Sequence, residues 1–178
     1  MGYDVRVTDM HVRIKLADGD SALNAMKEFN TNCPPAMKRG HSSADGRRWF
    51  SWMKEDFSQY ATLEEALGEM GFSVKHEGDW LTFVGWHGDK QGQEDLLMES
   101  IAGYVEHGSF VNWIGEDCER YRWEFISQRL LVREGTSDWN ALANTPTELR
   151  IKSMREMDAI MKLLEKAYPE ITEKQSNR

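Results

Sequence analysis

Apolar and polar residues alternate over positions 4–16, but they do so in two phases. Val5 and Val7 share the first phase, and the apolar positions from Met10 onward follow the second. Successive side chains of a strand point to opposite faces, so a shift of one residue moves every later apolar side chain to the wrong face. A β-bulge adds one residue to the strand, so the later apolar side chains return to the same face as the earlier ones. The pattern therefore predicts a strand with a bulge or a break near residues 8–9.

Helical periodicity follows in three places. The first predicted helix covers residues 21–33 and must end at the two consecutive prolines that come next. Thr62 and Glu65 form a capping box, which predicts the start of the second helix. The third covers residues 93–107, and its acidic residues, including Glu94, are expected to face water.

Five further strands are predicted by runs of β-forming residues between turn signals. They cover residues 72–76 and 80–86, then a hairpin over 108–126, and finally residues 129–133. Both faces of 80–86 are apolar, which predicts a central strand covered on two sides. In the hairpin, aromatic and charged residues alternate after an acidic turn at 115–119, so the aromatic side chains are expected to pack in the core.

The order of these elements contains the pattern βαββαβ, which is typical of a ferredoxin-like sandwich. The sequence thus predicts an α+β domain over residues 1–140, with an antiparallel sheet and helices on one of its faces.

A further helix is predicted within residues 145–170. Thr145 is an N-cap, Pro146 occupies the first helical position, and Glu148 completes the capping pattern. Its apolar stripe consists of Ile151, Met154, Met157, Met161, Leu164 and Tyr168. The helix is expected to pack on the second sheet face or to pair with its counterpart in a homodimer, and the central strand favours the first. Residues 171–178 are expected to form a disordered tail.

Composition narrows the class of protein. The chain has 178 residues, 40% of them hydrophobic, and a net charge of −8. Such a charge disfavours general binding to nucleic acids or anionic membranes. The N-terminus has no apolar core of a signal peptide, and no window approaches the ~18 apolar residues of a membrane span. The two cysteines, Cys33 and Cys118, have no metal-ligand spacing and are expected to be reduced thiols. We expect a cytoplasmic protein.

The most loop-like stretch covers residues 36–48, and its part from 38 to 48 is basic although the protein is acidic. It concentrates Lys38, Arg39, His41, Arg47 and Arg48. Arginine binds phosphate and carboxylate groups with two hydrogen bonds, so the loop is a candidate site for a phosphate, a nucleotide or an acidic partner surface. The alternative is a solvated loop without a ligand. No P-loop or dinucleotide fingerprint accompanies it.

Aromatic residues follow this loop directly. Trp49, Phe50 and Trp52 begin a run whose spacing through Tyr60 suits one face of a helix. Tryptophan and arginine dominate interface hot spots, so Trp49 and Trp52 beside the basic loop are candidate contacts for a partner. The alternative is a buried helix face.

No constellation of catalytic residues is evident. The five histidines are scattered, and no nucleophile elbow is present. His87 with Asp89, or Glu116 with Asp117, is better explained by a loop and a turn than by a metal site or an acid–base pair. We therefore expect no enzyme activity, no metal and no cofactor.

Two segments carry a resemblance. The opening, GYDVRVTDMHVRIK, resembles the GYxTxVxGxIxI start of small uncharacterised proteins of actinobacteria and their phages. Residues 101–126 resemble the helix and hairpin of the same proteins, GSxIxxxGEDGxxWxWxF, with Cys118 where glycine is usual and Tyr121 where tryptophan is usual. The resemblance implies a phage or mobile-element origin and no catalytic residues.

Two hypotheses of function follow. The first is a small intracellular, non-enzymatic binding protein that inhibits a host or defence protein through segment 36–60. The second is a nucleotide or small-molecule binder, such as a sponge for a signalling nucleotide, that uses the basic loop.

Overall fold

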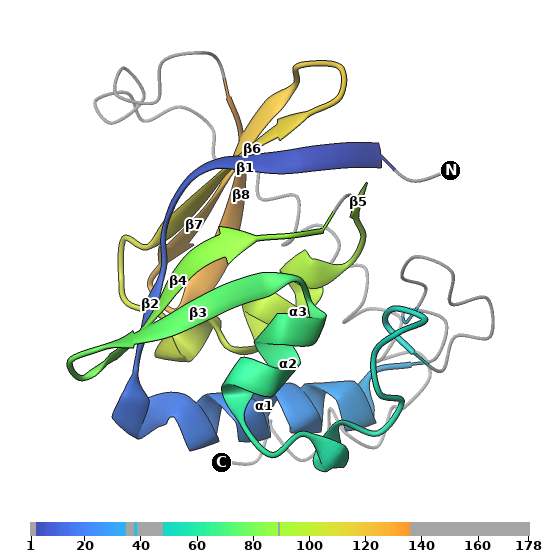
Figure 1. The fold of residues 1–178 in the computed structure, drawn as a ribbon, viewed down its shortest axis with the longest axis vertical. Coiled ribbons are helices and arrows are strands. Elements are labelled where there is room, and N and C mark those ends of the chain that lie inside the picture. The colour runs from blue at the N-terminus through green and yellow to red at the C-terminus, as the bar shows by residue number, and fades with distance from the viewer. Residues whose placement is uncertain (1–2, 35–37, 39–47, 89, 136–178) are drawn as a thin grey trace, which may run out of the picture.

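A computed structural model shows an α+β fold with antiparallel sheets and three α-helices in the described part of the chain (Figure 1). The structure describes residues 3–34, 38, 48–88 and 90–135. The helices are α1 (Gly19–Asn32), α2 (Leu63–Glu69) and α3 (Glu94–Ser100). The predicted C-terminal helix and tail lie outside the described residues.

The larger sheet has five strands in the order β5-β1-β6-β7-β8. They are β1 (Tyr3–His11), β5 (Lys90–Gln91), β6 (Phe110–Gly115), β7 (Arg120–Ile126) and β8 (Arg129–Gly135). All neighbours in this sheet are antiparallel. The predicted hairpin over 108–126 is confirmed as β6 and β7. The strand predicted over residues 129–133 is confirmed as β8.

The smaller sheet has three strands, β2 (Arg13–Lys15), β4 (Trp80–Trp86) and β3 (Phe72–Glu77), in that order. Only Val12 separates β1 from β2, so one stretch of chain supplies a strand to each sheet (Figure 1). The junction is held by a hydrogen bond from Phe83 N to Val12 O at 2.9 Å. The bent strand thus joins the two sheets.

The predicted bulge in the first strand is confirmed. The pairing of β1 with β6 changes register between Val7 and Asp9, and Thr8 is the extra residue. Because of it, Val5 before the bulge and Val12 after it are both buried in one core. The register shift therefore follows from the need to bury both apolar phases on one side.

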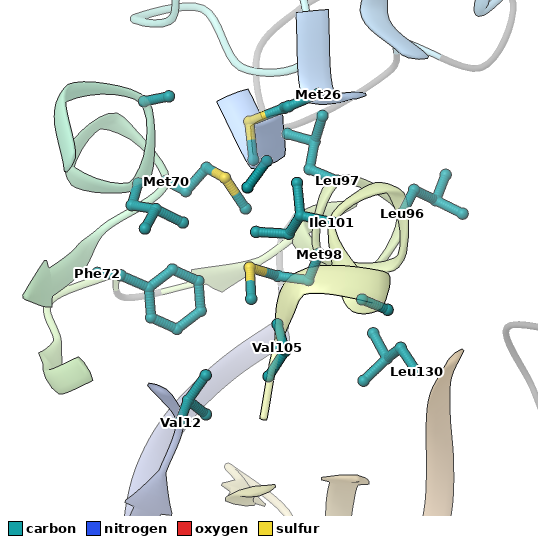
Figure 2. Packing of buried hydrophobic residues seen from close by; sticks show 14 of the residues in the cluster. Val12, Met26, Met70, Phe72, Leu96, Leu97, Met98, Ile101, Val105 and Leu130 are labelled. Carbon is teal, nitrogen blue, oxygen red and sulfur yellow. The ribbon is translucent and has the colours of Figure 1, made fainter. Parts of the chain in front are cut away.

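The helices pack together on one side of the strands. α1 contacts α2 and α3, while α2 lies on β3 and α3 on β8. Figure 2 shows the side chains of Met26 from α1, Met70 after α2 and Met98 from α3 pointing toward one another. All three methionines are in the core cluster. The core therefore lies between this helical layer and the inner faces of the two sheets.

The start of α2 matches its prediction. Thr62 is the N-cap, and its hydroxyl accepts a hydrogen bond from Glu65 N at 3.2 Å. The Glu65 carboxylate reaches back to Ala61 N at 2.9 Å. Gly71, with φ of +89°, follows the helix in the left-handed conformation that glycine adopts most readily.

Three local predictions are wrong. β4 is central in its sheet, but Val84 is 49% exposed, so the strand is not covered on both faces at this position. Glu94, expected to face water, is buried. Residues 49–60 form no α-helix, and their regular part is the 3-10 helix η3 (Phe57–Gln59). Their aromatic side chains other than Trp52 are buried by packing against other elements and not by helical periodicity.

A candidate contact surface around Trp52

Four of the seven predicted site residues lie in the described part of the chain: Lys38, Arg48, Trp49 and Trp52. Arg39, His41 and Arg47 lie outside it. The structure therefore bears on the aromatic half of the predicted site and on the two ends of the basic loop.

Trp49 belongs to the core. Its side chain is fully buried and stacks on Phe29 of α1, with ring centroids 5.7 Å apart. Its indole Nε1 donates a hydrogen bond to Asn30 Oδ1 at 2.9 Å, and Asn30 Nδ2 in turn donates to Glu55 O at 3.2 Å. Asn30 is itself buried. Trp49 thus anchors this segment to α1 and presents no surface to a partner.

Trp52 is the opposite case, because it is 55% exposed. Its Nε1 donates to the carbonyl oxygen of Glu69 at 2.8 Å, at the end of α2. One ring face stacks on Phe50, with centroids 5.2 Å apart and an angle of 16° between the planes. Phe50 is fully buried. The indole is therefore held in one orientation while more than half of it meets solvent.

Phe50 rests on the chain before α3. A Cβ placed on Gly92 would lie 2.6 Å from Phe50 Cε1, which is closer than carbon atoms approach. Any side chain at position 92 would displace the Phe50 ring, and with it the support of Trp52. Glycine is thus required at position 92 because the Phe50 ring lies so close, and not because of the backbone conformation there.

A buried carboxyl group lies beside this contact. Glu94 is 2% exposed, and its Oε2 accepts a hydrogen bond from Gly92 N at 2.6 Å. Burial raises the pKa of Glu94 to about 7, and the nearby charge of Asp95 raises it further, while backbone hydrogen bonds oppose the shift. The sequence placed Glu94 on a solvated helix face, because the helical pattern gives no sign that Phe50 packs against Gly92, two residues before it.

Polar contacts attach the segment to α2. The Tyr60 hydroxyl donates a hydrogen bond to Glu69 Oε2 and accepts one from Lys54 N at 3.1 Å. The Lys54 ammonium contacts the Glu65 carboxylate and lies 4.4 Å from the centre of the Tyr60 ring. Burial raises the pKa of Tyr60, and the hydrogen bond to Glu69 adds to the effect. The segment is therefore fixed although it lacks regular secondary structure.

The two described cations of the basic loop differ in their surroundings. Lys38 is half-buried, and burial lowers its pKa, while the nearby Cys33 and Glu55 oppose the shift. Arg48 is exposed, and its Nη1 donates to Ser51 O at 3.2 Å. Arg48 therefore belongs to the same turn as Trp52, whereas Lys38 lies beside Cys33.

The cysteines form no disulfide, as predicted. Cys33 is buried, and burial raises the pKa of its thiol to about 11, which keeps it protonated and unreactive at neutral pH. Cys118 is exposed in the turn between β6 and β7.

The described residues contain no group of three or more histidine, cysteine or acidic side chains placed to hold a metal ion. In the same part of the chain, no helix has the length and apolarity needed to cross a membrane. Trp113, Trp123 and Phe125 of β6 and β7 are buried core residues, as expected.

No protein-family model, no curated protein and no solved structure matches this chain.

Proposed function

We propose that the chain is a non-enzymatic binding protein of the cytoplasm that holds another protein through the Trp52 surface, which we define as the exposed residues Arg48, Ser51 and Trp52. From the resemblance to phage proteins, we infer that the partner is a host or defence protein and that binding inhibits it. The supporting observation is an indole that is exposed and yet held by a hydrogen bond and a stacked ring.

The energetics of interfaces support this role for Trp52. Tryptophan and arginine are the residues that most often contribute 2 kcal/mol or more to a protein interface, by the approximate measure of alanine substitution. Ordering a side chain on binding costs about 0.5 to 1.5 kcal/mol, and a side chain that is already held avoids most of this cost. The hydrogen bond to Glu69 O and the Phe50 ring hold Trp52 in the free protein.

The chemistry of the exposed groups also favours binding. An indole and a guanidinium offer a stacking face, hydrogen-bond donors and positive charge, and neither is a nucleophile or a general base at neutral pH. The nearby carboxyl of Glu94 is shielded from solvent. This combination fits an acidic or aromatic partner surface better than a reacting substrate.

The test compares the full chain with its Trp52→Ala variant, each immobilised and exposed to lysate of actinobacterial host cells. Val84→Ala is the matched control, because Val84 is about as exposed as Trp52 but lies in a different element, β4. We expect a host protein that the wild type and Val84→Ala recover and that Trp52→Ala loses by about tenfold or more. Recovery of the same proteins by all three chains would contradict the proposal.

Nucleotide binding by loop 38–48 is the alternative hypothesis of the sequence. A bound ligand stabilises only the folded state, by about 2.7 kcal/mol when its concentration is 100 times its dissociation constant. Thermal melting of the wild type against a panel of nucleotides therefore separates the two hypotheses. An increase in melting temperature that Arg48→Ala removes and Trp52→Ala leaves unchanged would favour the nucleotide.

From the topology we also propose that the two sheets are parts of one ferredoxin-like arrangement. The antiparallel pairs β6 with β1, β2 with β4, and β4 with β3 follow one another across the bent strand in the order expected for βαββαβ. In this reading β7 and β8 extend the sheet beyond its usual edge.

A further inference from the structure

The two faces of the larger sheet have different surroundings. Trp113, Trp123 and Val132 are cross-strand neighbours on the inner face, and all three belong to the core cluster with the helices. The alternate positions of the same strands point the other way. They form what we call the outer face: Phe110, Asn112, Ile114, Arg122, Leu131 and Arg133.

Part of the outer face is shielded from solvent. Leu131 is 7% exposed and Asn112 is 6% exposed, yet neither belongs to the core cluster. The ion pair of Arg133 Nε with Glu124 Oε2, at 2.6 Å, retains only 25% and 19% of its side-chain exposure. The helices of the described part of the chain pack on the opposite face. A sheet buries an apolar face against a neighbouring layer, so this shielded face, which no helix of the described part covers, calls for another element over it.

Arginine side chains outnumber acidic ones on this face of β6, β7 and β8, where Glu124 is the ion-pair partner of Arg133. Arg122 and Arg133 are direct cross-strand partners. Arg122 donates from Nε to Asn112 Oδ1 at 2.6 Å, and its guanidinium lies 4.4 Å from the centre of the Phe110 ring. Burial lowers the pKa of Arg122 and the charge of Arg133 lowers it further, while the charges of Glu124 and Asp9 oppose the shift. An apolar surface flanked by two neighbouring arginines fits an amphipathic element that carries acidic residues along its apolar stripe.

The sequence contains such an element directly after this sheet. The described chain ends with β8 at Gly135, and the helix predicted within residues 145–170 follows. Asp158 and Glu165 come four residues after Met154 and Met161, which places them beside the methionines on one side of that predicted helix. A helix over these residues is roughly 35 Å long at about 1.5 Å per residue, enough to cover a seven-residue strand of about 23 Å.

We propose that the C-terminal segment 145–170 docks on the outer face of the larger sheet of its own chain, with Met154, Met157 and Met161 on the apolar centre and with Asp158 and Glu165 toward Arg122 and Arg133. The occupant is this segment because it is tethered to β8. A short tether gives an effective concentration in the millimolar range, which favours the intramolecular contact over a second copy of the chain. The proposal uses none of the residues of the Trp52 surface.

Peroxide oxidation of methionine tests the proposal on the full chain, because a buried thioether reacts more slowly than an exposed one. The rates at Met154, Met157 and Met161 are measured by mass spectrometry and compared with those of the free peptide 145–170. We expect protection of about tenfold or more in the wild type, and its loss in Ile114→Glu and in Leu131→Glu. Val84→Glu, the same change on an exposed site of the smaller sheet, should keep the protection.

The buried Met26 and Met98 serve as the internal check of folding, since they must stay protected in every variant that is interpreted. If Leu131→Glu fails this check, Ile114→Glu decides, because Ile114 is only half-buried. Oxidation of the three methionines in the wild type at the rate of the free peptide would overturn the proposal. Protection that both outer-face variants retain would also overturn it. Protection that disappears on dilution, together with a dimeric mass, would assign the segment to a second copy instead.

Discussion

The protein has two aromatic regions that reach burial by different routes. In the hairpin of β6 and β7, Trp113 and Trp123 are buried because side chains of paired strands alternate between faces. Segment 48–60 has no such alternation, and its aromatic residues are buried by contacts with α1, α2 and the chain before α3. The hairpin buries its tryptophans completely, whereas the segment leaves Trp52 outside. Regular pairing thus serves the core, and the irregular segment can present a side chain to a partner.

The comparison predicts that both regions are equally necessary for folding despite their different regularity. Trp123→Ala and Trp49→Ala should each lower the free energy of unfolding by about 3 to 5 kcal/mol, because each removes a fully buried ring. Urea denaturation measures both. Trp49→Phe is the control: it keeps most of the packing and loses the bond to Asn30, so it should cost about 1 to 3 kcal/mol. A cost well under 1 kcal/mol for Trp49→Ala would show that the segment is not part of the core.

The second prediction concerns how stability depends on pH through Glu94, which lies beside the contact of Phe50 with Gly92. The pKa of Glu94 is about 7 in the folded protein and has its ordinary value in the unfolded chain. Between pH 4.5 and 7 the folded state therefore binds more protons than the unfolded state, so this group makes stability fall as pH rises through that window. Below and above it the contribution is constant.

Glu94→Gln should remove this fall. The glutamine carbonyl can still accept the hydrogen bond of Gly92 N and carries no charge to bury. We expect the variant to be more stable than the wild type by about 3 kcal/mol at pH 8 and equal to it near pH 4, as measured by denaturation across pH. Asp95→Asn, a neighbouring acid in the same turn, is the control and should leave most of the fall in place. Parallel pH profiles of wild type and Glu94→Gln would refute the assignment.

Trp52→Ala tests the same comparison at the exposed tryptophan. It removes one hydrogen bond to Glu69 O and one stacked ring face, so it should lower the free energy of unfolding by only about 1 kcal/mol. The same urea titration measures this value beside that of Trp49→Ala. A loss as large as that of Trp49→Ala would mean that Trp52 serves the fold and not a partner.

The smallest effect is expected in the turn of the hairpin. Cys118 has φ of +65°, in the left-handed region where a side chain is strained and glycine is not. Cys118→Gly should raise the melting temperature slightly, by the equivalent of about 0.5 to 1 kcal/mol, after the greater flexibility of glycine in the unfolded chain is subtracted. Cys118→Ala keeps the strain and should give no gain. A gain in both variants would point to the thiol and not to the backbone.

Local signals in the sequence predicted the parts of the fold whose cause is local. The phase change near residues 8–9 predicted the bulge, the capping box at Thr62 predicted the start of α2, and alternation predicted the hairpin. The candidate site was predicted only in part, because exposure does not follow from residue type. Trp49 and Trp52 look alike in the sequence, but one faces α1 and the other faces solvent.

The sequence by itself determined the α+β class and the order of the elements, because strand alternation, helix caps and turns depend on neighbouring residues. The tertiary structure alone decided that the first strand bends to join two sheets, that Glu94 is buried beside the contact of Phe50 with Gly92, and that Trp52 remains exposed. These features depend on contacts between residues far apart in the chain, such as Phe50 with Gly92 and Trp52 with Glu69. Such contacts have no periodic signature, since they are set by how the elements pack and not by the pattern within any one of them.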